Sequence, residues 1–156
     1  MTIQDKVRGT NISETTLLAT DYLNHFNEVV MMLDMVPSMT EFLDELREWQ
    51  PKSYQQHFRE ASFSDAELAV EAYDHVPLKY REPFEEIVAL LDRFVESAVR
   101  RLDDTVAAGD QTSTAAVATD YSERLMKLID LTGAIIHGHE DVLAQAQIDT
   151  LFPDHG

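Results

Sequence analysis

A heptad-like pattern in the last third of the chain constrains its fold most strongly. Between residues 118 and 142, apolar or semi-apolar residues recur at alternating intervals of three and four. They are Ala118, Tyr121, Leu125, Leu128, Thr132, Ile135, His139 and Val142. Such a repeat keeps one stripe of a helix facing a partner along its whole length. The pattern therefore predicts a long helix over residues 112 to 140 with one buried stripe.

The opposite face of this helix is where a functional site is expected. Each residue turns the helix by about 100°, so a second set of residues points away from the stripe. This set consists of Glu123, Lys127, Asp130, Ala134 and His137. We expect these side chains to face solvent or a binding partner.

A second stripe of the same kind precedes Gly109. Its members are Phe84, Val88, Leu91, Val95, Ala98 and Leu102. Pro83 suits the first turn of a helix, which predicts a helix over residues 83 to 108. A short polar turn then joins it to the helix over 112 to 140, so the two should fold back on each other. We predict an all-α fold, with a long antiparallel helical hairpin within a four-helix bundle, completed by an earlier helix or by a second copy of the chain.

The beginning of the chain predicts a flexible arm and then a helix. Residues 1–12 show no apolar periodicity. Ser13 is a suitable N-cap, and Pro37 should end a helix that runs to about Val36. Its expected buried face is Leu18, Tyr22, Phe26, Val29, Leu33 and Val36. The helical bundle domain should therefore span residues 13–140.

Additional short helices are expected between residues 38 and 77. Ser38 and Ser64 each precede a glutamate by three residues, the spacing of a capping box. These positions predict helices that open near Ser38 and near Ser64, with Pro51 and Pro77 as their respective ends. A further short helix is expected over 52–60.

Composition excludes several classes of function. The 156 residues carry a formal net charge of -17, which repels nucleic-acid phosphates and anionic lipid headgroups. The chain has no cysteine, so it has no disulfide and no thiolate metal site. Its longest apolar run is far shorter than the ~20 residues of a membrane span. We expect one cytoplasmic domain without nucleic-acid or membrane partners.

His-x-x-Glu spacing occurs three times and raises the possibility of a metal site. The pairs are His25/Glu28, His57/Glu60 and His137/Glu140. Bundle di-iron proteins use carboxylate and histidine pairs, but in the order Glu-x-x-His. On the first helix the periodicity also places Glu28 toward water. A structural or solvated role is therefore expected and no metal ligand is assigned, while a di-iron or hemerythrin-like bundle remains an alternative.

The segment IDLTGAII around Asp130 resembles the QDLTGQVI segment of the CheZ chemotaxis phosphatases. The preceding segment, from YREPF to the turn at Gly109, resembles the first hairpin helix of that family. The resemblance covers residues 78–152 and implies a homodimer in which two hairpins form a four-helix bundle. It also implies that the chain binds a phosphorylated CheY-type receiver domain and promotes its dephosphorylation.

The resemblance implies catalytic roles for Asp130 and His137. The family's aspartate pairs with a lysine of the receiver, and Asp130 matches it. The family's glutamine, which positions the attacking water, is replaced here by Ala134, which has no hydrogen-bonding group. His137 lies on the same face and is the candidate substitute. No cofactor of its own is implied, because the Mg²⁺ belongs to the receiver.

The C-terminal segment, residues 141–156, resembles the N-terminal CheY-binding peptide of the flagellar switch protein FliM. The resemblance rests on the sequence DVLAQAQIDTLF. It implies a receiver-binding helix or tail whose partner-binding residues are Leu143, Gln145, Ile148, Asp149, Leu151 and Phe152. Such a tail would add affinity by tethering the partner. A helical adaptor with neither activity, using residues 38–77, is the remaining alternative.

Overall fold

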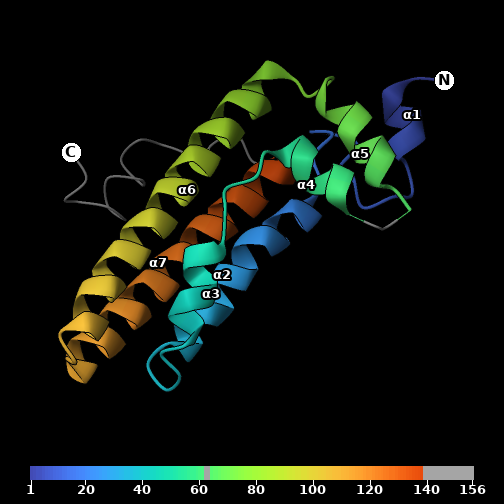
Figure 1. Ribbon diagram of the computed structural model, residues 1–156. Coiled ribbons are helices and arrows are strands. Elements are labelled where there is room, and N and C mark those ends of the chain that lie inside the picture. Colours follow the sequence, from blue (N-terminus) through green and yellow to red (C-terminus); the bar gives the residue numbers. More distant parts are fainter. Residues whose placement is uncertain (62–63, 139–156) are drawn as a thin grey trace.

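The computed structural model describes residues 1–61 and 64–138, and its regular elements are helical (Figure 1). In chain order they are α1 (Ile3–Val7), the 3-10 helix η1 (Thr20–Leu23), α2 (Asn24–Met35), α3 (Phe42–Glu48), α4 (Tyr54–Glu60), α5 (Ala66–Tyr73), α6 (Leu78–Ala107) and α7 (Gln111–Ile136). The predicted all-α class is confirmed. Within the described ranges, no helix combines the length and apolar character that a membrane span requires.

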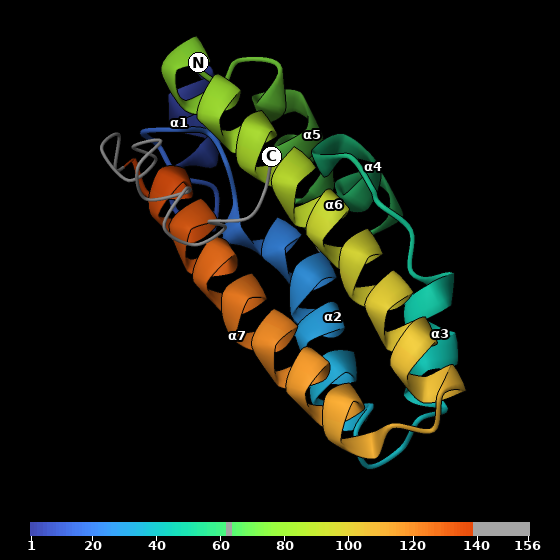
Figure 2. The ribbon, with the colours of Figure 1, turned by 90° about the vertical axis from the view of Figure 1, so that its left-hand side faces the viewer.

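The long helices α6 and α7 lie side by side, and a short turn joins them at one end of the molecule (Figures 1 and 2). Asp110 caps α7, because its Oδ1 accepts a hydrogen bond from the backbone N–H of Ser113 at 3.0 Å. The predicted stripe of α7 is buried at each described position, from Ala118 to Ile135. The stripe of α6 is buried too, except at Val88, which is only partly buried.

Shorter helices pack against α6 and α7. Helix α2 packs along α7, where the Ser122 hydroxyl donates a hydrogen bond to Asp34 at 2.7 Å. Helix α3 packs on α2 and α6, and Arg47 Nε donates to Asp103 at 2.8 Å. These contacts bury the apolar face that was predicted for the first helix, from Leu18 to Val36. One continuous apolar core results.

The first helix begins later than predicted. Residues 13–19 form a loop, and α2 starts at Asn24 after η1. The Ser13 hydroxyl accepts hydrogen bonds from the N–H groups of Thr15 and Thr16 at 3.2 Å, which is a local turn. The Thr16 hydroxyl in turn donates to the carbonyl of Ile136 at 2.6 Å. This long-range bond holds the loop against the end of α7. Such tertiary contacts favour the loop conformation of residues 13–19 over a helix.

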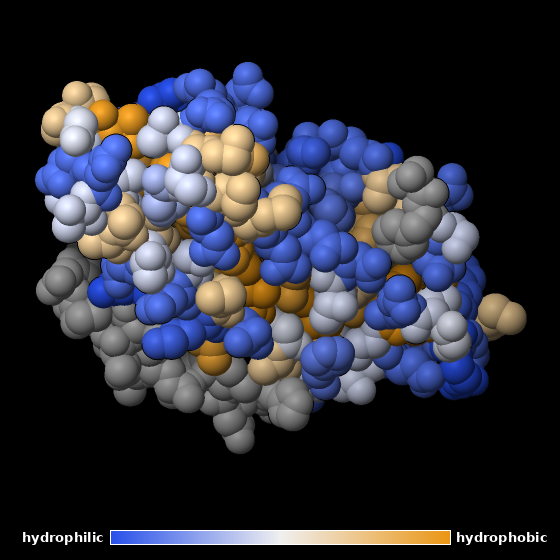
Figure 3. Space-filling view, turned by 90° about the horizontal axis from the view of Figure 1, so that it is seen from below, coloured by the Kyte–Doolittle hydropathy of each residue, from blue (hydrophilic) through white to orange (hydrophobic). Residues whose placement is uncertain are grey.

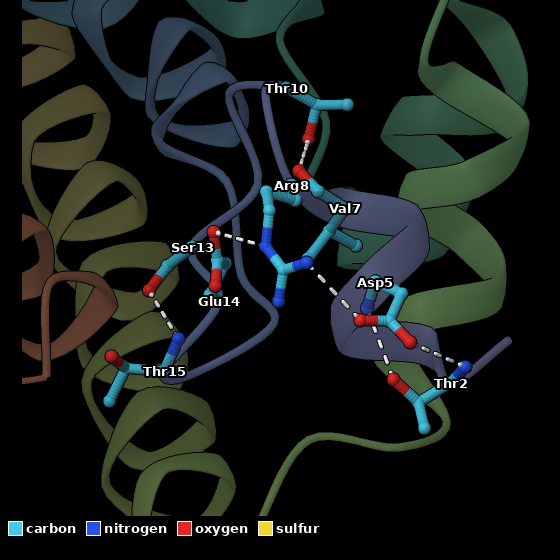
Figure 4. Close-up of polar contacts among 8 residues, drawn as sticks. All are labelled: Thr2, Asp5, Val7, Arg8, Thr10, Ser13, Glu14 and Thr15. Carbon is cyan, nitrogen blue, oxygen red and sulfur yellow. Dashed lines mark hydrogen bonds and ion pairs between the residues drawn. The ribbon is translucent and has the colours of Figure 1, made fainter.

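The segment 1–12, expected to be a flexible arm, carries packed structure instead. Thr2 and Asp5 form a reciprocal capping box that opens α1, and Val7 is fully buried (Figure 4). Arg8 lies between Asp5 and Glu14, at 3.3 and 3.4 Å. The buried contacts are made by single apolar residues, which is why a test for periodicity overlooks them.

Neither of the two capping boxes predicted for the middle of the chain forms. Helix α3 begins at Phe42 without a side-chain cap, and the Ser38 hydroxyl donates to the carbonyl of Met35 instead. Helix α5 also begins without a side-chain cap, after Asp65. By contrast, Ser53 does cap α4, accepting from the N–H of Gln56 at 3.1 Å.

The two long helices also differ from the predicted bounds. Helix α6 starts at Leu78, so Pro83 lies inside it and not at its first position. As the sixth residue of α6, Pro83 lies past the four N–H groups that have no partner within a helix, so its missing N–H removes one main-chain hydrogen bond. Helix α7 ends at Ile136, with His137 as its C-cap, because Gly138 adopts a left-handed backbone conformation with φ 93°.

Gly138 offers a test of how tightly the end of α7 is held. A Cβ at this position would lie 3.1 Å from Cγ2 of Thr15, whereas a Cβ at Gly109, which has φ 67°, meets nothing within 4 Å. Both glycines follow a long helix in the left-handed region. We expect Gly109→Ala to lower the free energy of unfolding by about 1 kcal/mol and Gly138→Ala by about 2 kcal/mol. Chemical denaturation measures both, and equal losses would contradict the close contact with Thr15.

Candidate functional site

The face of α7 opposite its buried stripe carries the candidate site. Asp130 and His137 are both exposed, and so are Glu123 and Lys127, while Ala134 is partly buried. Asp130 and His137 are seven residues apart, which at 1.5 Å per residue separates them by about 10 Å along the helix. Every charged or polar member of the predicted face is therefore accessible to a partner.

The charged groups of this face are available for new contacts. Within the part of the chain that the structure describes, Glu123, Lys127 and Asp130 form no ion pair and no side-chain hydrogen bond. The nearby Arg124 is different, because its Nε pairs with Asp120 at 3.1 Å. Asp130 thus presents a hydrated carboxylate that a cationic group of a partner can approach.

Ala134 and His137 differ in what they can do to a substrate. Alanine offers no donor and no acceptor, so it cannot orient a water molecule. His137 can do both, and its position as the C-cap fixes it at the last turn of α7. The six residues predicted to bind a partner in the tail, Leu143, Gln145, Ile148, Asp149, Leu151 and Phe152, lie outside the described residues.

The underside of the molecule brings hydrophobic side chains to the surface among hydrophilic ones (Figure 3). Large apolar residues that are exposed include Met31 and Met35 of α2 and Met126 of α7. Met126 is 45% exposed although its neighbour Leu125 is fully buried. The surface of α2 and α7 therefore includes exposed apolar side chains, although the chain as a whole is strongly acidic.

A cluster of aromatic and histidine side chains, which the sequence pattern did not predict as a unit, joins η1, α2, α4 and the segment after α3. The His25 ring stacks on Trp49 at 4.4 Å between ring centres and lies 6.2 Å from His57. Tyr22 packs edge-on against His57 at 5.5 Å. The Trp49 indole N–H donates to the carbonyl of His25 at 3.1 Å, and the Tyr22 hydroxyl donates to the carbonyl of Lys52 at 2.6 Å.

Burial sets the protonation of the two histidines. Burial, with a smaller effect of the neighbouring His57, lowers the pKa of His25 to about 4. Burial also lowers the pKa of His57. Both imidazoles are therefore neutral at pH 7. The sequence contains the members of this cluster at Tyr22, His25, Phe26, Trp49 and His57. Their spacing along the chain does not predict that they lie together in the fold.

The other histidines that the structure describes, His75 and His137, do not join this pair. His75 follows α5 and His137 ends α7, and both are exposed. Glu28 is exposed, as the periodicity of the first helix predicted. Among the described residues, no group of three or more histidine, aspartate or glutamate side chains lies in an arrangement that could hold a metal ion.

Asp92 on α6 is half-buried, and its Oδ1 is a second buried atom without a hydrogen-bond partner. Burial, with a smaller effect of Glu96, raises the pKa of Asp92 to about 6. The folded state therefore binds the proton more tightly than the unfolded state, whose pKa is 3.8. Stability owed to this group is present at low pH and is lost as the pH rises through about 6.

Asp92→Asn should consequently stabilise the protein at pH 7. We expect a gain of about 1 kcal/mol in the free energy of unfolding there, which shrinks toward zero near pH 4, where the wild-type carboxyl is already protonated. Asp104→Asn, an exposed position on the same helix, is the control and should change little. Urea unfolding at pH 4 and pH 7 measures the difference, and a gain that is the same at both values would contradict the burial of a charged Asp92.

Comparisons with protein-family models, with curated proteins and with solved structures find no match to this chain. No family membership follows from them. The function of the chain therefore rests on the chemistry of its own residues, above all the exposed face of α7.

Proposed function

We propose that this chain is a CheZ-like signalling protein that binds the phosphorylated receiver domain of a CheY-type response regulator through the exposed face of α7. The observation that carries the proposal is Asp130, an exposed carboxylate without a partner among the described residues, on a helix whose other face is buried. Asp130 belongs to the DLTGA segment, which resembles a segment of the CheZ phosphatases. We infer the receiver domain as the partner from this resemblance.

The chemistry of this face fits such a partner. A free carboxylate on a rigid helix pays little conformational entropy to pair with a lysine, and charge-assisted hydrogen bonds are the strong ones. Lys127 and Glu123 lie one and two turns before Asp130 and add two further charges for orienting a partner. The exposed Met126 offers an adjoining apolar contact.

Dephosphorylation requires a group that places water in line with the aspartyl phosphate. The water oxygen attacks phosphorus, the P–O bond to the receiver's aspartate breaks, and inorganic phosphate leaves. Positioning is most of what a protein supplies to this reaction. Ala134 cannot position the water, so His137 is proposed as the positioning group. If His137 does not position the water, the chain binds and sequesters the receiver without dephosphorylating it.

The finer architecture is part of the same proposal. We propose that α2 and α3 complete a four-helix arrangement with α6 and α7 in one chain, because both pack on the long helices. The homodimer remains a prediction, with Met31 and Met35, the exposed methionines of α2, as its proposed contact. The tail of residues 141–156 is proposed as a second, tethered contact to the receiver.

The test uses the full chain and a set of purified receiver domains, each with and without an acyl-phosphate mimic such as beryllofluoride. We expect one receiver to bind at least tenfold more tightly with the mimic, and a chain that ends at residue 140 to bind it more weakly. Release of phosphate from the phosphorylated receiver, at rising amounts of this protein, then separates an enzyme from a binder. Equal binding with and without the mimic would contradict the proposal and favour the adaptor alternative.

A further inference from the structure

A groove lies between the end of α3 and the middle of α6, two helices that pack against each other (Figure 2). Its volume is about 370 Å³, near the lower end of the ~300–1,000 Å³ that small-molecule sites have. We call it the Trp49 groove, and it is lined by Leu46 and Trp49 on one side and by Val95, Glu96, Val99 and Arg100 of α6 on the other. A ligand with one aromatic ring suits this size.

Trp49 gives the groove a rigid aromatic wall. Its indole N–H donates to the carbonyl of His25 at 3.1 Å, and its ring stacks on the His25 ring at 4.4 Å between centres. These two contacts fix the plane of the indole. Because His25 covers only one face of the ring and Trp49 also lines the groove, the remaining ring surface is available to a planar group of a ligand.

Arg47, which also lines the groove, holds its two sides together. The Arg47 Nε donates to Asp103 of α6 at 2.8 Å, and the same guanidinium pairs with Asp44 of α3. Two carboxylates thus balance the charge of Arg47. The groove is formed before a ligand arrives, which lowers the entropic cost of binding.

Two opposite charges at the rim have no partner. Glu96 and Arg100 are both exposed, and neither forms an ion pair or a side-chain hydrogen bond with a described residue. They are four residues apart on α6, about 6 Å along the helix, a spacing at which such residues can pair. The groove therefore presents one free carboxylate and one free guanidinium beside the aromatic wall.

We propose that the Trp49 groove binds a free aromatic α-amino acid. The Arg100 guanidinium would bind the ligand's carboxylate, and Glu96 would accept hydrogen bonds from its ammonium group. The aromatic ring of the ligand would stack on Trp49. An end of a peptide carries only one of these two charges, so the free amino acid is the better match. This site shares no residue with the exposed face of α7 and does not depend on the receiver proposal.

The experiment uses the full chain, whose single tryptophan is Trp49. Its fluorescence, excited where phenylalanine does not absorb, reports directly on the groove. Phenylalanine should cause a saturable change with a Kd of about 1 mM or lower. Phenylalaninamide lacks the carboxylate and N-acetylphenylalanine lacks the ammonium group, so each should bind at least tenfold more weakly. This comparison needs only wild-type protein.

Variants then assign the two charges. Arg100→Gln and Glu96→Gln should each weaken phenylalanine binding at least tenfold. Arg93→Gln and Glu86→Gln, at exposed positions of α6 outside the groove, are the matched controls and should bind as wild type does. All four side chains are exposed, so the variants should fold, which circular dichroism verifies.

Three results would each overturn the proposal. The first is the absence of a saturable fluorescence change up to about 10 mM phenylalanine. The second is equal binding of phenylalanine and its two derivatives, which would show that the ligand's charges are not recognised. The third is unchanged affinity in folded Arg100→Gln and Glu96→Gln proteins.

Discussion

Replacing Leu125 with alanine is expected to lower the free energy of unfolding by about 3 kcal/mol, among the largest effects of a single truncation in this chain. Leu125 is fully buried at the centre of the α7 stripe. Truncation removes its apolar contacts and leaves a cavity that the long helices, packed along their length, cannot close. For a domain of this size the loss corresponds to a decrease in Tm of roughly 6–12 °C.

Met126→Ala is the matched control, because the neighbouring side chain on the same helix is 45% exposed. Its change should remain below about 1 kcal/mol. Thermal and urea unfolding of both variants give the two values. A Leu125→Ala protein as stable as Met126→Ala would show that the stripe of α7 is not a packed seam.

Asp130→Lys is expected to reduce receiver binding at least tenfold. The change replaces a partner for a receiver lysine with a like charge, which removes an attraction and adds a repulsion. Because Asp130 is exposed and has no partner among the described residues, the stability of the protein should change by less than about 0.5 kcal/mol. A loss of binding at unchanged stability would assign the contact to this face of α7.

Glu67→Lys controls for the change in overall charge. Glu67 is exposed on α5, and its replacement alters the net charge of -17 by the same amount. Isothermal titration at two salt concentrations should show little effect of Glu67→Lys and a large effect of Asp130→Lys. If both variants bind alike, the acidic field of the whole protein attracts the receiver and Asp130 has no special role.

The exposed face of α7 and the cluster around His25 and His57 differ in how they arise. The face of α7 is a local feature, since the positions of Lys127, Asp130 and His137 follow from helical geometry once the stripe is known. The histidine pair is a product of packing, since His25 and His57 are 32 positions apart in the chain. It forms because Tyr22 and Trp49 bond the loop between α3 and α4 to η1 and α2, which brings α4 beside them.

Helix boundaries show the same division. The turn at Gly109 and the stripes of α6 and α7 were predictable, because spacing within a helix depends only on neighbours in the sequence. The start of the first helix was not, because Ser13 forms a local turn and Thr16 bonds to Ile136, which is 120 positions away. The two predicted capping boxes that do not form are a further example. The Ser38 hydroxyl, for instance, donates to the carbonyl of Met35 and does not cap α3.

The sequence by itself determined that this chain is helical, where its two longest helices bury their stripes, and that Asp130 and His137 share the outer face of α7. Helical periodicity depends only on adjacent turns, so it can be recognised without knowledge of the fold. Only the tertiary structure decided that residues 13–19 form a loop against the end of α7, that α1 is packed, and that His25 and His57 meet beside Trp49. Those outcomes depend on contacts between distant segments, whose free energies local patterns do not contain.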